Sequence, residues 1–335
     1  MEALLIAAYC LVISSGIFGN VLVCIVIFRN TELRSSRNLL ILNLSVCDIF
    51  MDLVCMPLSL VRLTLKNWPL GEFLCRIIPS MQTVDVFVST FTILAIAIDR
   101  YHAIVRASRE KRKSRKNIYV IVGIWIVSLL FSTPMLLFHQ VETVDVMDFT
   151  MCVENWPNTA FRGTFGVIVM VVQYLSPTLV ISCLHARICH FLHARIEENP
   201  VTLTEMNRAV RDMRRHRRNL FLLTAITITF ASTWLPLTVL NIAADFDHNF
   251  FDEKHFNLVF AWCLLLAMGS SSLNPIFYGW FNLNFRKGFY ALLCFGIPDN
   301  EQSERSSLNS REKRSQSAMY DSIRSNQSHK SNSSK

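Results

Sequence analysis

Four oxygen-bearing side chains lie inside long hydrophobic stretches of the sequence: Asp48, Ser89, Asn274 and Asp85. Carboxylate, hydroxyl and amide oxygens suit a small hard cation, and an ionisable group in such a stretch is costly enough to indicate function. Asp85 lies one helical turn before Ser89, so both face one side of a helix. We predict a sodium site, to which Asp52 is a further candidate. A water-filled polar core without a specific ion is the alternative.

Three neutral amides also interrupt hydrophobic stretches: Gln82, Gln173 and Asn241. An amide group is expensive to bury without hydrogen-bond partners. The three predict a cavity in which they contact a ligand, and hydrogen bonding between helices is the alternative.

The stretch from Cys75 to Val105 connects several of these features. It carries Cys75 at one end, Gln82 and Asp85 inside, and Asp99-Arg100-Tyr101 at the other end. As a helix, the segment from Cys75 to Arg100 is about 37 Å long, which is enough to cross the hydrocarbon core of a bilayer, about 30 Å thick. We therefore predict a membrane helix that joins a polar site to a charged cluster.

The composition supports a membrane protein. The chain has 335 residues, of which 52% are hydrophobic and 17% charged. Its hydrophobic blocks are long enough to span a bilayer, which a soluble domain does not explain. We predict an all-α bundle of seven transmembrane helices at residues 3–28, 38–63, 75–105, 118–138, 163–192, 219–244 and 256–280.

The charges in the connecting segments predict the orientation. Lysine and arginine concentrate in segments 29–37, 106–116 and 208–218, whereas acidic residues concentrate in 142–154 and 245–253. Basic loops stay in the cytoplasm, so we expect a multi-pass plasma-membrane protein with the N-terminus outside and the C-terminus inside. Because these basic residues flank membrane helices, a nucleic-acid partner is excluded.

Cys75 and Cys152 then lie on the oxidising side of the membrane, where disulfides form. Unlike the other eight of the ten cysteines, both stand in connecting segments. We predict a disulfide between them, with two free thiols as the alternative.

The C-terminal region divides into two parts. Residues 282–295 alternate apolar and basic side chains at helical spacing, which is typical of an amphipathic helix on the inner membrane surface. Cys294 is a candidate for palmitoylation there, or a plain thiol. We assign residues 1–298 to the membrane domain and expect the polar, serine-rich segment 299–335 to be disordered.

The ordered motifs of the chain resemble those of rhodopsin-like (class A) G-protein-coupled receptors over nearly its whole length. They are Gly19-Asn20, residues 43–48, residues 68–71, Cys75 with Cys152, Asp99-Arg100-Tyr101, Trp125, Pro177, Trp234-Leu235-Pro236 and Asn274-Pro275-Ile276-Phe277-Tyr278. Within this class, the chain is similar to neuropeptide Y and neuropeptide F receptors, particularly invertebrate ones. Pro79, Gln82, Gln173, the run 234–241 with Asp245, and residues 274–289 carry that similarity.

The resemblance implies a ligand and a site. The ligand is an amidated neuropeptide, and Asp245 pairs with an arginine near its C-terminus. Gln82 and Asn241 hold the amidated end, and Gln173 and Thr238 complete the site. A carboxylate suits a guanidinium group because the two form charge-assisted hydrogen bonds.

The resemblance also implies a receptor mechanism without catalysis or a cofactor, apart from an allosteric sodium ion. The residues expected to carry activation and G-protein coupling are Asp99, Arg100, Tyr101, Trp234, Pro236, Asn274, Pro275 and Tyr278. The expected partners are a heterotrimeric G protein of the Gi/o type, arrestin and a receptor kinase at the serine-rich tail, and membrane lipid.

Other classes of membrane protein would require different residues. A receptor of this class for a biogenic amine usually has an acid where Gln82 stands, and Asp85 lies three residues further along. A receptor for a different peptide also stays open. A retinal protein needs a lysine in the last span, and residues 256–285 contain none. A small-solute transporter would show internal repeats, which the sequence lacks.

Overall fold

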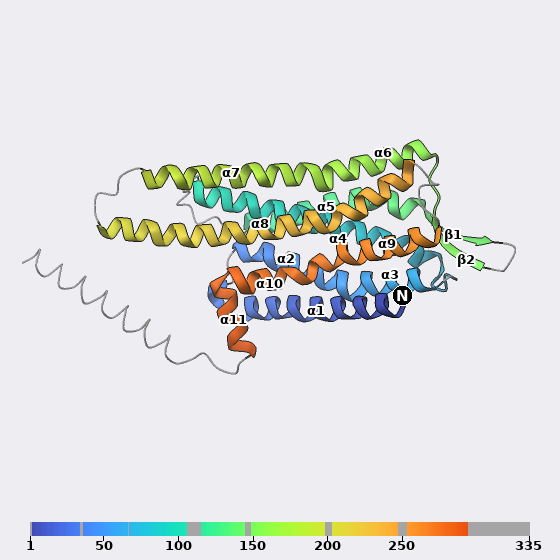
Figure 1. The fold of residues 1–335 in the computed structure, drawn as a ribbon, viewed down its shortest axis with the longest axis horizontal. Helices are drawn as coiled ribbons and strands as arrows, with labels where there is room; N and C mark the ends of the chain where they lie inside the picture. The colour runs from blue at the N-terminus through green and yellow to red at the C-terminus, as the bar shows by residue number, and fades with distance from the viewer. Residues whose placement is uncertain are drawn as a thin grey trace, which may run out of the picture. The chain divides into compact units, whose positions relative to one another are not determined.

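The computed structural model describes residues 2–33, 36–65, 67–105, 115–144, 149–197, 203–246 and 253–293. One compact unit, Met1–Arg286, contains seven helices that are long and apolar enough to cross a membrane (Figure 1). These spans confirm the predicted seven-helix bundle, and they are Ala3–Arg29, Asn38–Thr64, Gly71–Val105, Asn117–Phe138, Thr159–Phe191, Phe221–Ala244 and Phe256–Phe281.

The second span is interrupted just before a proline. It consists of α2 (Ser36–Phe50), the π-helical segment η2 (Met51–Cys55) and α3 (Met56–Thr64). Pro57 has no N–H to donate, and its ring disfavours a regular turn before it, so a wider turn stands there. The second span follows α1 (Glu2–Arg29) and the short 3₁₀ segment η1 (Thr31–Leu33) in the chain.

Helix α4 (Gly71–Val105) lies at the centre of the bundle. It contacts α2, α7 (Ser176–Glu197), α8 (Leu203–Phe246) and α5 (Arg115–Phe138). Its side chains are the most buried of any span, with 61% of its most apolar window inside the protein against 11% for Thr159–Phe191. A helix surrounded by others can expose polar groups to protein rather than lipid, which allows Gln82 and Asp85 within it.

The remaining helices contain further irregular segments. The fifth span combines α6 (Thr159–Val169), the π-helical segment η3 (Met170–Leu175) and α7, with Pro177 just after η3. The seventh combines α9 (Glu253–Met268), the 3₁₀ segment η4 (Gly269–Ser272) and α10 (Leu273–Phe281). Gln173 and Asp52 lie in the two π-helical segments, which often occur at functional sites.

A β-hairpin connects the fourth and fifth spans, in a region that the sequence analysis treated as a loop. Strands β1 (His139–Val144) and β2 (Phe149–Glu154) pair antiparallel, with Val141 opposite Cys152. The hairpin and the start of α1 lie at the same end of the bundle, which we call the hairpin end (Figure 1).

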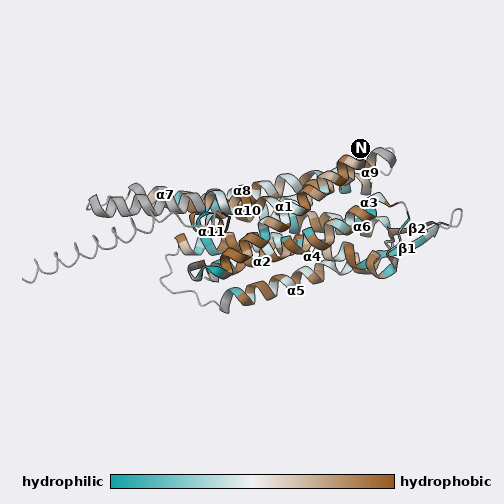
Figure 2. Ribbon diagram, turned by 90° about the horizontal axis from the view of Figure 1, so that it is seen from below, coloured by the Kyte–Doolittle hydropathy of each residue, from teal (hydrophilic) through white to brown (hydrophobic). Residues whose placement is uncertain are grey.

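Hydrophobic side chains cover much of the helix surface. Figure 2 shows hydrophobic residues along α2, α4 and α5, and hydrophilic ones in the hairpin. Leu130, Ile228 and Val239 are among the exposed side chains within spans. This pattern is expected where lipid rather than water surrounds the helices.

A second unit comprises Lys287–Lys335. Its described part is the end of α11 (Leu283–Leu293), so a helix covers most of the predicted segment 282–295. Cys294, the predicted domain boundary at residue 298 and the tail 299–335 lie outside the described residues, and these expectations stay predictions.

Candidate functional site: two cavities that share Trp234

A large cavity of about 240 Å³ lies toward the hairpin end. Residues of α6, η3 and α8 form its walls, together with Glu154 from β2 and Phe260 from α9. Three predicted ligand contacts, Gln173, Thr238 and Asn241, line this cavity together. The structure therefore assembles these polar groups in one space, surrounded mainly by aromatic and aliphatic side chains, as is typical of ligand pockets.

Two other predicted ligand residues are placed differently. Gln82 is not among the residues that line the large cavity; its amide nitrogen donates to the Ser59 hydroxyl, between α4 and α3. The backbone of Asp245 continues α8, but its side chain lies outside the described part of the chain. Both assignments stay predictions.

The charged residues that line the large cavity, Glu154 and Arg162, were not among the predicted site residues. Glu154 Oε2 accepts a hydrogen bond from Trp156 Nε1 (2.9 Å) and lies 3.6 Å from Arg162 Nε. The only sequence signal for Glu154 was its position two residues after Cys152 in an acidic loop. Helix α6 presents Arg162 here because Asn158 caps its first turn, accepting from the Phe161 N–H.

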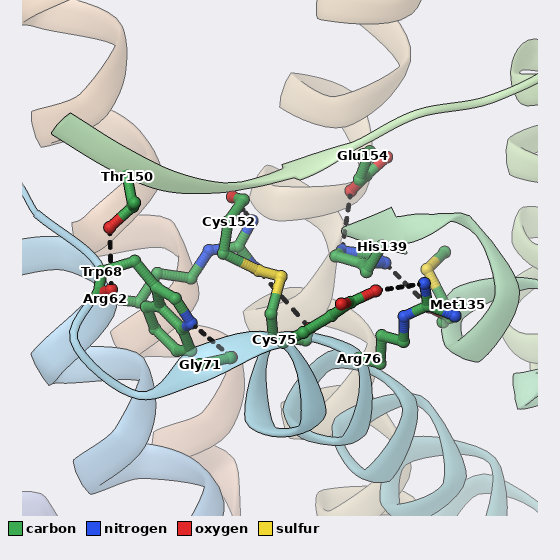
Figure 3. The surroundings of a disulfide bond; sticks show 11 residues. Arg62, Trp68, Gly71, Cys75, Arg76, Met135, His139, Thr150, Cys152 and Glu154 are labelled. Atoms are coloured by element: carbon green, nitrogen blue, oxygen red, sulfur yellow. Dashed lines mark hydrogen bonds and ion pairs between the residues drawn. A yellow bond between two sulfur atoms is a disulfide. The ribbon is translucent and has the colours of Figure 1, made fainter. Parts of the chain in front are cut away.

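His139 approaches the same carboxylate from the end of α5. Its ring is 1% exposed, with Nε2 3.6 Å from Glu154 Oε1 and Nδ1 2.9 Å from the Met135 carbonyl oxygen (Figure 3). A carbonyl oxygen only accepts, so Nδ1 carries the hydrogen in the neutral ring. Burial lowers the pKa of His139, and the charge of Glu154 partly opposes that shift.

The predicted disulfide between Cys75 and Cys152 is present, and it ties β2 to the start of α4 (Figure 3). Hydrogen bonds reinforce the connection: the Trp68 N–H donates to the Thr150 carbonyl oxygen (2.8 Å), and Trp68 Nε1 donates to that of Gly71 (2.8 Å). Glu154 belongs to the same strand as Cys152, so this tether fixes the carboxylate over the large cavity.

A small cavity of about 20 Å³ lies deeper in the bundle. All four predicted cation-site residues line it: Asp48, Ser89, Asn274 and Asp85. They come from α2, α4 and α10, so the tertiary fold brings together residues that are far apart in the sequence. The cavity has room for a water molecule or a small ion only.

The oxygen atoms around the small cavity suit a cation. Asp48 Oδ2 accepts from Asn274 Nδ2 (2.8 Å), and the buried Ser89 hydroxyl has no hydrogen-bond partner among the described residues. No lysine, arginine or histidine is among the residues that line this space. Among the described residues, no group of three or more histidine, cysteine or acidic side chains is placed to hold a metal ion. The two carboxylates, the hydroxyl and the amide oxygen are hard donors, and this set of donors fits sodium.

Asp52 lies beside the small cavity rather than in its lining. Its Oδ1 accepts from the Ser271 hydroxyl (2.9 Å), and its Oδ2 packs against α1, where a Cβ added to Gly16 would lie only 2.1 Å away. A glycine at residue 16 is thus required by the close approach of this carboxylate. Asp52 is therefore connected to the lining by its hydrogen bond with Ser271.

The two cavities share Phe230 and Trp234, which line both. Their rings lie 5.8 Å apart, and the Trp234 carbonyl oxygen accepts from the Thr238 hydroxyl (2.9 Å). Pro236 lies within α8 between these contacts. A ligand that moves Trp234 in the large cavity thereby changes a wall of the small one.

The predicted coupling residues lie further along the same helices. Asp99 is buried, Arg100 is half-buried, and both belong to the last turns of α4. Tyr278 is buried, and its ring packs against Phe285 at 5.6 Å. His185 Nδ1 lies 3.2 Å from the Thr224 hydroxyl oxygen, between α7 and α8.

The sequence profile of the 7 transmembrane receptor (rhodopsin family) matches residues 19–278, and the chain belongs to this family. The match covers all seven spans except the start of the first and the end of the last. This is a family of receptors, so the chain is a receptor rather than an enzyme.

The similar proteins include receptors for neuropeptides. The chain is 35% identical to a neuropeptide F receptor of Drosophila melanogaster over 87% of its own length and 62% of that receptor. It is 32% identical to neuropeptide Y receptor type 6 of Oryctolagus cuniculus over 90% of the chain and 84% of that receptor. It is 30% identical to a QRFP-like peptide receptor of Branchiostoma floridae over 85% of the chain and 76% of that receptor.

Proposed function

We propose that this chain is a plasma-membrane receptor for an amidated neuropeptide, of the neuropeptide Y, neuropeptide F or another RF-amide or RY-amide type, and that it signals through a Gi/o protein. The names of its relatives support a peptide ligand. The observation that carries the proposal is that Phe230 and Trp234 line both cavities. A ligand that binds in one cavity then biases the state of the other.

The hairpin end faces the outside in this proposal, as the distribution of basic residues favours. The peptide enters the large cavity with its amidated end between Gln173, Thr238 and Asn241, whose side chains offer donors and acceptors. Gln82 and Asp245 complete the site, with Asp245 accepting an arginine of the peptide.

Sodium would be held by Asp48, Asp85, Ser89 and Asn274. When bound, it supplies positive charge to two carboxylates that have no cationic neighbour in the cavity lining. Asp48 and Asn274 hold a hydrogen bond across the cavity from α2 to α10, and any movement of Trp234 disturbs the packing around it. The ion thereby favours the peptide-free, inactive state.

The opposite end of the bundle accepts the G protein in this proposal. Movement of α8 about Pro236 opens the space beside Arg100 and Asp99, while Tyr101, Pro275 and Tyr278 complete the changing contacts. Arrestin and a receptor kinase act at the serine-rich tail, and Cys294 carries a lipid that contacts the membrane. Asp85 lines only the small cavity, so the large cavity offers a biogenic amine no carboxylate at that position.

A G-protein activation assay in cells tests the ligand class. The panel contains amidated peptides ending in Arg-Phe-amide and Arg-Tyr-amide, the same peptides as free acids, and biogenic amines. We expect responses to the amides alone, blocked by inactivating Gi/o with pertussis toxin. A response to amines, or none to any peptide with the receptor at the cell surface, would contradict the proposal.

A further inference from the structure

The large cavity carries aromatic side chains in two separate places. Phe230 and Trp234 form one pair, and both also border the small cavity. Trp156 and Phe165 form a second pair, which lines the large cavity but is not among the residues that line the small one. We call this second pair the hairpin platform. It belongs neither to the wall between the cavities nor to the proposed site for the amidated end.

Local structure places the hairpin platform near the entrance. Trp156 follows the end of β2 by two residues, and α6 begins at the hairpin end with its first turn capped by Asn158 (Figure 1). Phe161 and Phe165 are four residues apart on α6, so they lie on one side of it. Their rings are 5.8 and 5.3 Å from that of Trp156. The platform is therefore the exposed edge of a larger aromatic cluster.

This cluster holds Trp156 from several sides. Its ring lies 4.6 Å from that of Phe138 at the end of α5, and its Nε1 donates to Glu154 Oε2 (2.9 Å). The strand of Glu154 is tied to α4 by the disulfide. Trp156 and Phe165 are nevertheless only half-buried. A fixed, partly exposed aromatic surface loses little freedom when a ligand covers it, and such surfaces are typical of strong binding sites.

Helix geometry gives the distance between the hairpin platform and the proposed amide site. Phe165 precedes Gln173 by eight residues in the same span, and both line the large cavity. At about 1.5 Å per residue, their separation along the span is about 12 Å. An extended peptide covers about 3.3–3.6 Å per residue, so about three or four residues cover this distance. Residues upstream of the amidated end pass the platform, because the peptide enters from the hairpin end.

We propose that the hairpin platform is a binding subsite for an aromatic side chain of the peptide, about three or four residues before its C-terminal residue. This inference rests on the proposed function, which places the amidated end beside Gln173 and leaves the arginine of the peptide with Asp245. Aromatic rings gain from offset or edge contacts with one another beyond the burial of apolar surface. The subsite therefore distinguishes an aromatic side chain from an aliphatic one of similar size.

Competition binding to the full-length receptor in membranes tests the subsite, with a labelled amide from the activation panel as the tracer. The competitors are alanine-rich amidated octapeptides that end in Arg-Phe-amide. They carry phenylalanine, cyclohexylalanine or alanine at the third or the fourth residue before the C-terminal one. Cyclohexylalanine keeps the size and hydrophobicity of phenylalanine but has no aromatic ring. A spacing control carries phenylalanine at the sixth residue instead.

The receptor variants are Trp156→Leu and Phe165→Leu, with Phe161→Leu as the matched control. Phe161 packs against Trp156 in the same cluster but is not among the residues that line the cavity. In the wild type, we expect phenylalanine to bind about twofold to tenfold more tightly than cyclohexylalanine at one of the two positions, the range of an aromatic pair. Both platform variants should bring this ratio toward one, and Phe161→Leu should keep it. The ratio cancels any general loss of affinity in a variant.

Several outcomes would overturn the inference. Equal binding of the phenylalanine and cyclohexylalanine peptides to the wild type would do so, as would the same gain in the spacing control. A preference that persists in both platform variants but is lost in Phe230→Leu would place the ring beside Trp234 instead. If no amide of the panel activates receptor present at normal surface levels, the proposed function fails. If panel amides activate it and the preference is absent, the subsite alone fails.

Discussion

The large and small cavities share walls from α8 and α9, but they hold their polar groups in opposite ways. In the large cavity, the Glu154–Arg162 pair is partly exposed and 3.6 Å apart. In the small cavity, Asp48 and Asn274 are buried and joined by a 2.8 Å hydrogen bond. A partly exposed ion pair costs little to separate, whereas a buried hydrogen-bonded pair is costly to separate.

The difference in size has the same consequence. The large cavity, at about 240 Å³, can admit side chains of a peptide, while the small one, at about 20 Å³, admits a water molecule or an ion. Trp234 and Phe230 belong to both. One region is thus suited to recognise a ligand and the other to stabilise a particular arrangement of helices.

The largest effect should come from filling the narrow space behind the small cavity. In Gly16→Ala, the new Cβ would meet Asp52 Oδ2 at 2.1 Å, and Asp52 is fully buried with its other oxygen held by Ser271. We expect a loss of stability of about 1–3 kcal/mol, as for overpacked sites. Thermal inactivation of the purified receptor measures it.

Gly123→Ala is the matched control, because an added Cβ there meets nothing within 4 Å. Since alanine is a better helix former than glycine, this variant should be at least as stable as the wild type. Equal stability of the two variants would show that the contact between Gly16 and Asp52 does not constrain the small cavity.

A second, smaller effect should separate the lining residues of the small cavity from their neighbours. Sodium at ten times its dissociation constant should stabilise the wild-type receptor by about 1.4 kcal/mol relative to choline at equal ionic strength. We expect Asp85→Asn to remove most of this increment, because Asp85 lines the cavity. The measurement is thermal inactivation in the two salts.

Asp52→Asn is the comparison variant for this experiment. Asp52 is not among the lining residues, so this substitution should lower overall stability but keep the sodium increment. An increment that survives in Asp85→Asn and disappears in Asp52→Asn would place the ion next to Asp52 instead.

The smallest effect should appear at the edge of the large cavity, as a dependence on pH. The pKa of His139 is lowered in the folded protein, mainly by burial. The unfolded chain therefore binds the proton more readily, so the contribution of neutral His139 is present above about pH 6.5 and is lost as the pH falls below that value. We expect a loss of less than about 1 kcal/mol, because Glu154 opposes the shift.

Thermal inactivation as a function of pH measures this effect. His139→Gln should flatten the profile, while His190→Gln, an exposed position on α7, should leave it unchanged. A wild-type receptor that becomes more stable on acidification would mean that the ion pair of protonated His139 with Glu154 outweighs the cost of burying its charge.

The sequence predicted the parts of this protein that depend on local pattern. Long hydrophobic blocks give the seven spans because only a helix satisfies its backbone within a bilayer. The cysteines in two connecting segments predicted the disulfide. Hydrophobicity does not predict local helix geometry, however, and the π-helical turns at η2 and η3 were not expected, although Pro57 and Pro177 follow them.

The candidate sites divide in the same way. The types of Asp48, Ser89, Asn274 and Asp85 suggested a cation site, because oxygen donors in a hydrophobic stretch are unusual enough to be informative. Glu154 and Arg162 carried no such signal, since charged residues in a loop between spans are ordinary. The placement of Glu154 at the large cavity depends on a hairpin that the sequence did not distinguish from a loop.

What the sequence determined by itself is therefore the number of spans, the disulfide and the kinds of polar group within the helices. Only the tertiary structure decided that Gln82 bonds Ser59 rather than lining the large cavity, and that Trp234 borders both cavities. The physical reason is that hydrophobicity and residue type are local properties. The direction of a side chain depends on helix rotation and on neighbours from distant segments.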